Sequence, residues 1–175
     1  SNFYADRARY AFQTQIFFLL SRYHQQNRGI PELSADGKNL IGDYTFEKDA
    51  LFAAINLKGD ELEMYYRVHE ALAEKIQTPD LIVYLRANVE LLMQRIALRD
   101  RPYERNMERA YIAELAEAYD EFYLRRSRSA PVMIVEVAPL DFVSRPGDLR
   151  WIENRIKQAL QVAPFQPELP LSLPE

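Results

Sequence analysis

The sequence predicts an α/β fold in which a parallel sheet is sandwiched by helices. Two short apolar runs, at residues 81–85 and 132–137, are continuous rather than alternating. Continuous runs of this length are typical of strands buried on both faces of a parallel sheet. Segments with apolar residues three or four positions apart, which favour helices, precede and follow both runs. This alternation of strands and helices indicates the α/β class.

The first part of the chain predicts three helices and one further strand. Residues 5–26 carry many apolar side chains and few helix breakers, which indicates a long, largely buried helix. The stretch 27–39 is rich in Gly, Pro, Ser and Asp and predicts a loop. A short strand is expected over residues 40–46 and a short helix over 48–55. The apolar spacing in 60–75 predicts another helix, which begins after Gly59.

The second part predicts three more helices and a charged turn. Asn88 is a good N-cap, so a helix is expected over residues 89–98. Residues 100–106 form a charged turn that contains Pro102, and residues 107–126 form a long amphipathic helix. A final helix is expected over residues 149–160, after the Pro-Gly-Asp sequence at 146–148.

The length of 175 residues suits one domain, which we assign to residues 1–162. Residues 163–175 contain four prolines and form a Pro-rich tail that we expect to be extended or disordered. Three strands are few for this fold class, and the chain begins at Ser1 without an initiator Met. We therefore expect a longer protein, with one or two more strands upstream.

Composition argues against several classes of function. The net charge of −4 disfavours a nucleic-acid or membrane-surface partner. The absence of Cys removes disulfides, thiolate nucleophiles and Cys-ligated zinc, and only two His are present. No apolar run is long enough to cross a membrane, and no signal-peptide pattern is found, so we expect a cytoplasmic protein.

Three arginines form the sharpest local pattern. Arg95 and Arg99 are one helical turn apart, Arg101 follows in the turn, and Glu104 completes the motif R-x3-R-x-R-x2-E. Guanidinium groups that converge at a helix end can bind phosphate through bidentate hydrogen bonds. A solvated charged helix end would give the same spacing, so the pattern alone leaves both interpretations open.

Two further groups of polar residues are candidates for a site. Gln15 and Arg22 lie on an aromatic-rich helix, and an amide offers the donor and acceptor that a nucleobase edge requires. Asp43 and Asp49 lie near the carboxyl end of the expected strand 40–46, where α/β sheets bind ligands. Each group also fits an ordinary structural role, a core helix in the first case and turn acids with a helix cap in the second.

Taken together, four segments resemble the deoxyribonucleoside kinase family, in particular its bacterial deoxyadenosine and deoxyguanosine kinases. The segments are FYADRARYAFQTQIFFLLSR at 3–22, DYTFEKDALF at 43–52, PDLIVYL at 79–85 and RIALRDRPYE at 95–104. Their order and gaps match over roughly residues 3–143. The resemblance implies a P-loop kinase fold that here lacks its N-terminal strand or strands. It also implies phosphorylation of a deoxyribonucleoside 5′-hydroxyl by ATP with Mg²⁺, in nucleotide salvage, by a homodimer.

The resemblance also implies roles for individual residues. Gln15 would recognise the base, Arg22 and Asp49 would form the polar end of the base pocket, and Tyr4 and Glu104 would hold the sugar 3′-hydroxyl. Deoxyadenosine is the expected acceptor. Three aromatic residues would line the cavity: Phe3, Tyr10 and Phe12. The lid arginines that close on the ATP phosphates would be Arg95, Arg99 and Arg101, with Arg99 and Arg101 acting in catalysis.

The chain departs from the family pattern in three places. The phosphate-binding loop GxxxxGK[ST] and the carboxylate base that follows it are expected upstream of Ser1, so the 175-residue chain by itself is expected to be nearly inactive. The family's acid-Arg-Ser triplet aligns with Asp43, Tyr44 and Thr45, so its arginine is missing. Lys48 is a candidate for the missing cation.

Two other functions stay open at this point. The chain could be a non-catalytic nucleoside-binding or partner subunit derived from such a kinase, or a nucleoside monophosphate kinase, which also closes an arginine lid. The set Tyr4, Gln15, Arg22 and Asp49 favours a nucleoside acceptor, because a monophosphate would need a further cation near the sugar 5′ position.

Overall fold

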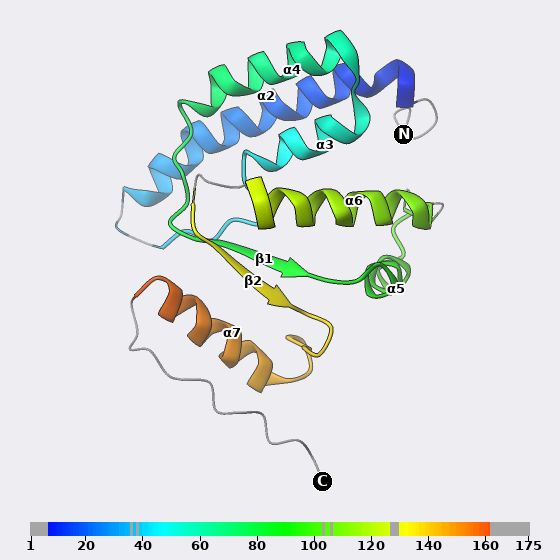
Figure 1. Cartoon of the computed structure of the whole chain (residues 1–175). Helices are drawn as coiled ribbons and strands as arrows, with labels where there is room; N and C mark the ends of the chain where they lie inside the picture. Colours follow the sequence, from blue (N-terminus) through cyan, green and yellow to red (C-terminus); the bar gives the residue numbers. More distant parts are fainter. Residues whose placement is uncertain are drawn as a thin grey trace.

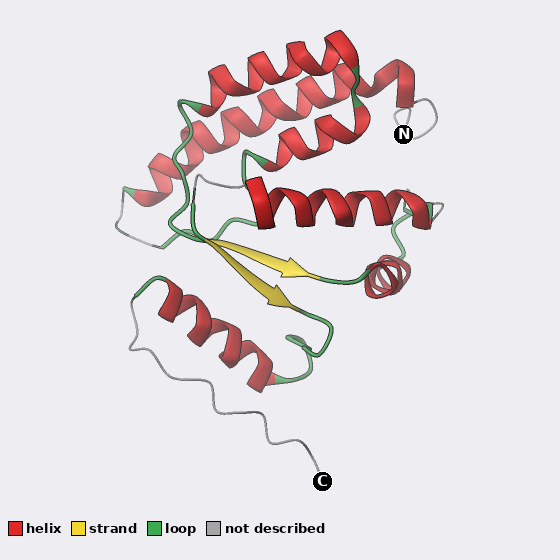
Figure 2. Ribbon diagram, viewed as in Figure 1, coloured by secondary structure: helices red, strands yellow, loops and turns green. Residues whose placement is uncertain are grey.

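Two parallel strands form the sheet, and helices cover both of its faces (Figures 1 and 2). The computed structural model describes residues 7–35, 37, 39–102, 104–105, 107–126 and 130–161. Strand β1 (Ile82–Arg86) pairs with β2 (Val132–Glu136) in a register that runs from Ile82 opposite Val132 to Arg86 opposite Glu136. The predicted α/β class and parallel sheet are therefore confirmed.

A helical layer lies on one face of the sheet. It contains α2 (Arg7–Ser34), α3 (Lys48–Asn56), α4 (Gly59–Ala73) and α6 (Arg109–Glu121), while α7 (Pro146–Ala159) covers the opposite face (Figure 1). Helix α6 continues into a π-helical turn (Phe122–Arg126), so the predicted helix 107–126 is confirmed except for its irregular ends.

Helix α5 (Val89–Arg99) follows the carboxyl end of β1 and has clear boundaries. The Asn88 side chain accepts a hydrogen bond from the Leu91 N–H at 2.9 Å, which confirms the predicted N-cap. At the other end, Asp100 adopts a left-handed conformation with φ of 45°, so the chain turns away from the helix axis.

Apolar packing holds the layers together in three clusters. The largest lies among α2, α3 and α4 and includes Leu19, Phe46, Ala53, Leu57 and Tyr65. A second, aromatic cluster joins the amino end of the sheet to α6, and a third packs α7 against β2. The apolar periodicity of residues 48–55 and 60–75 thus gives the helices it predicts, and the polar candidates on α2 and α3 border the largest cluster.

The predicted loop over residues 27–39 is wrong in its first part. Helix α2 continues to Ser34 and includes Pro31. Proline has a helical φ and removes only one backbone donor, and the helix ends soon afterwards, with the Ala35 N–H bonded to the Pro31 carbonyl at 3.0 Å. Pro31 therefore marks the last turn of the helix rather than its end.

The strand predicted over residues 40–46 is also wrong. This stretch is irregular and ends in a turn, in which the Lys48 N–H bonds to the Thr45 carbonyl at 3.1 Å. A strand needs a neighbour for its backbone groups, and among the described residues β1 and β2 pair only with each other. The described sheet consequently has two strands instead of three.

Burial on both faces of the sheet is only partly confirmed. Leu85 on β1 is 48% exposed and Ile134 on β2 is 40% exposed, although Ile82 and Val135 are buried. A two-stranded sheet covers fewer of its apolar side chains than the wide parallel sheet that the continuous runs predicted. The Pro-rich tail lies outside the described residues, as do Phe3 and Tyr4.

Candidate active site

Two of the predicted site residues, Arg22 and Asp49, meet where α2 packs against α3, and Gln15 lies two turns earlier on α2. Gln15 and Arg22 are two turns apart and therefore lie on the same face of α2. Asp49, in the first turn of α3, is only 3% exposed, and its Oδ1 lies 3.6 Å from Arg22 Nε. Gln15 is 6% exposed. The structure thus brings Arg22 and Asp49 together and buries Gln15, whose part in binding a base stays a prediction.

Tyr44 completes this arrangement, although it was absent from the predicted site. Its hydroxyl donates a hydrogen bond to Asp49 Oδ1 at 2.5 Å, and its ring lies 3.3 Å from the Arg22 guanidinium carbon. The position was noted in the sequence only because it lacks the family's arginine. A tyrosine in an irregular segment carries no periodic signal that would identify it as a site residue.

Three buried side-chain atoms have no hydrogen-bond partner in the described structure: Glu47 Oε2, Asp49 Oδ2 and the Tyr65 hydroxyl on α4. An unpartnered buried polar group costs roughly 1–3 kcal/mol. Tyr65 is fully buried, and its apolar spacing on α4 predicted only a core position. Atoms of this kind fit a polar ligand that would supply the missing hydrogen bonds.

Burial dominates the electrostatics of the cluster. It raises the pKa of Asp49 to about 6, against the opposing effects of Arg22, His69 and Lys48. It also raises the pKa of Tyr65, which the charge of Asp49 raises further. Burial, with the nearby charge of Arg22, lowers the pKa of Lys48. The site therefore contains a carboxyl group that changes charge close to neutral pH.

Lys48, the candidate for the missing cation, lies beside two aromatic rings. Its ammonium lies 5.0 Å from the Tyr44 ring centroid and 5.4 Å from that of Tyr119. The charge of Asp43 acts on it, but Asp43 itself is exposed. Tyr10 and Phe12, predicted to line the cavity, are half-buried on α2, and Phe12 packs against the core cluster among α2, α3 and α4.

The predicted lid residues form a second group at the end of α5. Arg99 donates two hydrogen bonds to Glu104 Oε2, at 2.6 Å from Nη2 and 3.0 Å from Nε. Arg101 Nη1 lies 3.8 Å from Glu104 Oε1, and Glu104 is 8% exposed. Arg95 is exposed one turn earlier on α5. Glu104, which was expected to hold the sugar 3′-hydroxyl, thus brings Arg99 and Arg101 together.

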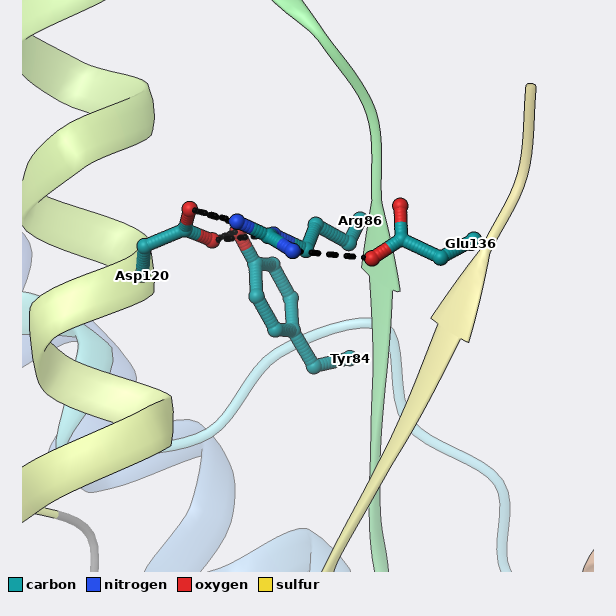
Figure 3. Close-up of polar contacts among 4 residues, drawn as sticks. All are labelled: Tyr84, Arg86, Asp120 and Glu136. Atoms are coloured by element: carbon teal, nitrogen blue, oxygen red, sulfur yellow. Dashed lines mark hydrogen bonds and ion pairs between the residues drawn. The ribbon is translucent and has the colours of Figure 1, made fainter.

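A further ionic group, which the sequence did not reveal, joins the carboxyl ends of both strands to α6 (Figure 3). Arg86 donates to both oxygens of Asp120, with the shortest bond 2.7 Å from Nη2, and to Glu136 Oε1 at 2.9 Å. The Tyr84 hydroxyl donates to Asp120 at 2.8 Å. The bond from Arg86 lowers the pKa of Asp120. The alignment of Arg86 with Glu136 depends on strand register, which sequence spacing does not give.

Among the described residues, no helix is long and apolar enough to span a bilayer. No group of three or more His, Asp or Glu side chains in the described part is placed to hold a metal ion.

The family model for deoxynucleoside kinases matches residues 1–161. The chain belongs to the deoxynucleoside kinase family. The resemblance seen in the sequence, and with it the P-loop kinase fold and a phosphotransferase family, is thereby confirmed. Members of this family phosphorylate deoxynucleosides.

The relatives include kinases named for different bases. Deoxyguanosine kinase of Bacillus subtilis is 29% identical over 161 residues, covering 90% of this chain and 78% of the relative. Deoxyadenosine kinase of Dictyostelium discoideum is 33% identical over 137 residues, covering 75% of this chain and 54% of the relative.

Solved structures agree with the fold. Deoxyadenosine kinase from M. mycoides with bound dATP superposes with a TM-score of 0.74 at 23% identity, over 89% of this chain and 79% of that one. The same enzyme with bound dCTP gives a TM-score of 0.70 at 24% identity, over 89% and 78%. The match covers the helical layer and the sheet, since it includes nearly all of the chain.

Proposed function

We propose that the protein transfers the γ-phosphoryl group of ATP to the 5′-hydroxyl of a deoxyribonucleoside, with deoxyadenosine as the preferred acceptor. The observation that carries the proposal is the Arg22–Asp49 pair, which leaves the buried Asp49 Oδ2 without a partner. A purine base that enters beside this pair would give Oδ2 the hydrogen bond that it lacks, and buried Gln15 on the same face of α2 would supply an amide to the base edge.

The chemistry of the cluster favours adenine over guanine. An amide can make two hydrogen bonds to the N6 amino group and the N7 of adenine. In this proposal the contacts to N6 and N7 turn the 6-position of the purine toward Asp49. The free carboxylate oxygen Oδ2 then accepts a hydrogen bond from the 6-amino group of adenine and is repelled by the O6 of guanine. Leaving such a buried acceptor unpaired is the usual way in which a site rejects the wrong base.

Arg99 and Arg101 act on the phosphates in this proposal. In the transfer the 5′-hydroxyl gives its proton to a general base and a bond forms between the 5′-oxygen and the γ-phosphorus. The bond from that phosphorus to the bridging oxygen breaks, and ADP leaves. Arginines stabilise the charge that spreads over the transferred group. Both guanidiniums would exchange Glu104 for phosphate oxygens when ATP binds. Mg²⁺ would accompany the ATP phosphates, and we assign no ligand for it among the described residues.

The same proposal places the protein in the cytoplasm, in nucleotide salvage, as a homodimer without nucleic-acid or membrane partners. Apolar side chains exposed on α2 and α4 support a dimer formed through these helices: Phe17, Leu20 and Met64.

Substitution of Gln15 tests the nucleoside pocket. We expect Gln15→Ala in the full-length protein to raise KM for deoxyadenosine by roughly tenfold or more, because the base loses a two-point contact. Steady-state phosphorylation of deoxyadenosine measures this change. The matched control is Gln13→Ala, since Gln13 is exposed on the same helix and should leave KM unaltered. An unchanged KM and base preference in Gln15→Ala would overturn the assignment.

The nature of the acceptor needs a separate comparison. Full-length protein is offered deoxyadenosine and its 5′-monophosphate with equal ATP. Phosphorylation of the nucleoside alone agrees with the proposal, and preference for the monophosphate contradicts it. Binding of deoxyadenosine without turnover by the full-length protein would instead identify a non-catalytic nucleoside-binding subunit.

A further inference from the structure

Tyr44 contacts both members of the Arg22–Asp49 pair. Its hydroxyl lies 2.5 Å from Asp49 Oδ1, and its ring lies 3.3 Å from the Arg22 guanidinium carbon. The pair itself is separated by 3.6 Å between Arg22 Nε and Asp49 Oδ1. A hydrogen bond to a carboxylate and a cation–π contact are both stronger in a partly buried site than in water.

The backbone of Tyr44 is also tied to α2. Gln26 Nε2 lies 3.5 Å from the Tyr44 carbonyl oxygen, one turn beyond Arg22 on the same helix. This contact links the irregular segment before α3 to the helix that carries Arg22. The tyrosine therefore joins α2 to the first turn of α3 through its main chain and its side chain.

These contacts leave the two oxygens of Asp49 in different states. Oδ1 receives the Tyr44 hydroxyl and faces Arg22, whereas Oδ2 is buried and has no hydrogen-bond partner in the described structure. A carboxylate fixed in this way presents a single acceptor in a fixed direction. Loss of the tyrosine hydroxyl would free Oδ1 and let the group turn or take up a proton.

We propose that Tyr44 is a positioning residue that sets the base preference: it holds Asp49 as a carboxylate with Oδ2 as its one free acceptor, so that the site selects the 6-amino group of adenine over the 6-oxo group of guanine. The inference rests on the proposed function, because it concerns the pocket that binds the deoxyribonucleoside. It also gives a role to the tyrosine that stands where the resemblance leads one to expect arginine.

Removal of the hydroxyl alone tests this role. In the full-length protein, Tyr44→Phe keeps the ring beside Arg22 and removes the donor to Asp49. We expect the ratio of kcat/KM for deoxyadenosine to that for deoxyguanosine to fall by roughly tenfold at about pH 7.5. We expect the substitution to raise KM for deoxyadenosine and to leave kcat for this substrate unchanged.

The matched control is Tyr123→Phe. The Tyr123 hydroxyl lies 3.3 Å from the Thr45 hydroxyl and makes no described contact with Asp49. This variant should keep the wild-type ratio, whereas an equal loss in both variants would show a general effect of removing a hydroxyl. A wild-type protein that phosphorylates neither nucleoside overturns the proposed function, while an active protein with an unchanged ratio in Tyr44→Phe overturns only this inference.

The pH dependence of the wild-type protein gives a second measurement that needs no variant. Burial holds the pKa of Asp49 at about 6, so below that pH the group is protonated and the preference for deoxyadenosine should decline. The titratable or charged groups around Asp49 are Arg22, Tyr44, Lys48, Tyr65 and His69. A preference that is constant from about pH 5 to 8 contradicts the proposal.

Tyr44→Phe should move this inflection to higher pH. A hydrogen bond donated to a carboxylate favours its charged form, so removal of the donor raises the pKa. His69 makes no described hydrogen bond to Tyr44, and an inflection that belongs to His69 would stay in place. An unmoved inflection therefore counts against Tyr44 as the residue that keeps Asp49 ionised.

Discussion

Asp49 combines deep burial with incomplete pairing. It has one hydrogen-bonded oxygen, one unpartnered oxygen and an arginine 3.6 Å away. Buried ion pairs often fail to offset the desolvation of their charges, and the raised pKa of Asp49 shows that burial outweighs the nearby cations here. A group that destabilises the folded protein in this way is typical of a binding site.

The free-energy cost of burying the charged Asp49 carboxylate can be measured from the pH dependence of stability. Since the folded pKa of Asp49, about 6, exceeds its unfolded value, the native state binds more protons between the two values. Its contribution to stability is therefore favourable at low pH and is lost as the pH rises to about 6. We expect wild type to lose about 1–2 kcal/mol of unfolding free energy relative to Asp49→Asn between about pH 4 and 7, after allowance for solvent screening.

Urea denaturation of both proteins across this range measures the difference. Titrating groups that do not interact with Asp49 contribute equally to the two proteins and cancel in the comparison, whereas the charge of Asp49 also acts on His69 and Lys48. A constant difference would show that Asp49 has an ordinary pKa in the folded state.

The residues of the proposed site were predictable to different degrees. Gln15 and Arg22 were predicted from their place on an aromatic-rich helix, Asp49 from the end of an expected strand, and the roles of all three from the resemblance to the family. The strand is absent from the described sheet, so the position of Asp49 follows from the resemblance alone. Tyr44 and Tyr65 were missed, because their importance depends on tertiary contacts between segments far apart in the sequence. The sequence supplies the chemical groups of the pocket, but packing decides which of their atoms are left without partners.

Among the elements, the turn between α5 and α6 explains why Arg99 and Arg101, the two arginines proposed to act on the phosphates, converge on Glu104. Arg99 is the last residue of α5, and the left-handed Asp100 turns the chain. The Glu104 N–H then bonds to the Arg101 carbonyl at 2.9 Å, which closes the turn and brings its side chain to Arg99. The motif R-x3-R-x-R-x2-E therefore brings Arg99, Arg101 and Glu104 together only because the chain turns between them.

Arg99 provides the test of the lid. We expect Arg99→Ala in the full-length protein to lower kcat at least tenfold, because arginines of this kind contribute on the order of 10³–10⁵ in phosphoryl transfer. Arg105→Ala is the matched control: its guanidinium pairs with Asp100 in the same turn, is exposed and should be dispensable. ATP-dependent phosphorylation at saturating nucleoside distinguishes them, and a fall of less than a few-fold in Arg99→Ala removes the arginine from the lid.

The elements themselves were predictable where local signals agree. Helices α3, α4 and α5 follow from apolar spacing and, for α5, from the Asn88 cap. The segment 40–46 has the composition of a strand, but a strand exists only if a neighbour accepts its hydrogen bonds. Residues 27–34 show the opposite error, because a helix already formed continues through Gly29 and Pro31.

For the whole molecule, the ionic group of Arg86 connects layers that otherwise meet through apolar side chains. It joins the carboxyl ends of β1 and β2 to α6, whose amino end follows the lid turn (Figures 1 and 3). The aromatic cluster of Tyr84, Tyr119 and Tyr123 packs the same helix against the sheet. Both contacts fix α6 on the sheet and thereby the position of the turn that carries Arg101 and Glu104.

Asp120→Asn tests this connection, because it removes the carboxylate to which Arg86 and Tyr84 donate. We expect the variant to lower Tm by roughly 2–4 °C near neutral pH, as the bidentate bond and its charge are lost. Glu90→Gln is the matched control, since it breaks only the exposed pair of Glu90 with Arg109 and should leave Tm unchanged.

The sign of the pH dependence separates this effect from simple loss of packing. The depressed pKa of Asp120 means that its contribution is present above the unfolded pKa and is lost as the pH falls through the folded one. The difference in Tm between wild type and Asp120→Asn should therefore close in acid, below the usual range of an aspartate. A difference that persists there would mean that the asparagine disturbs packing around Tyr84, and that the ionic connection to α6 contributes little.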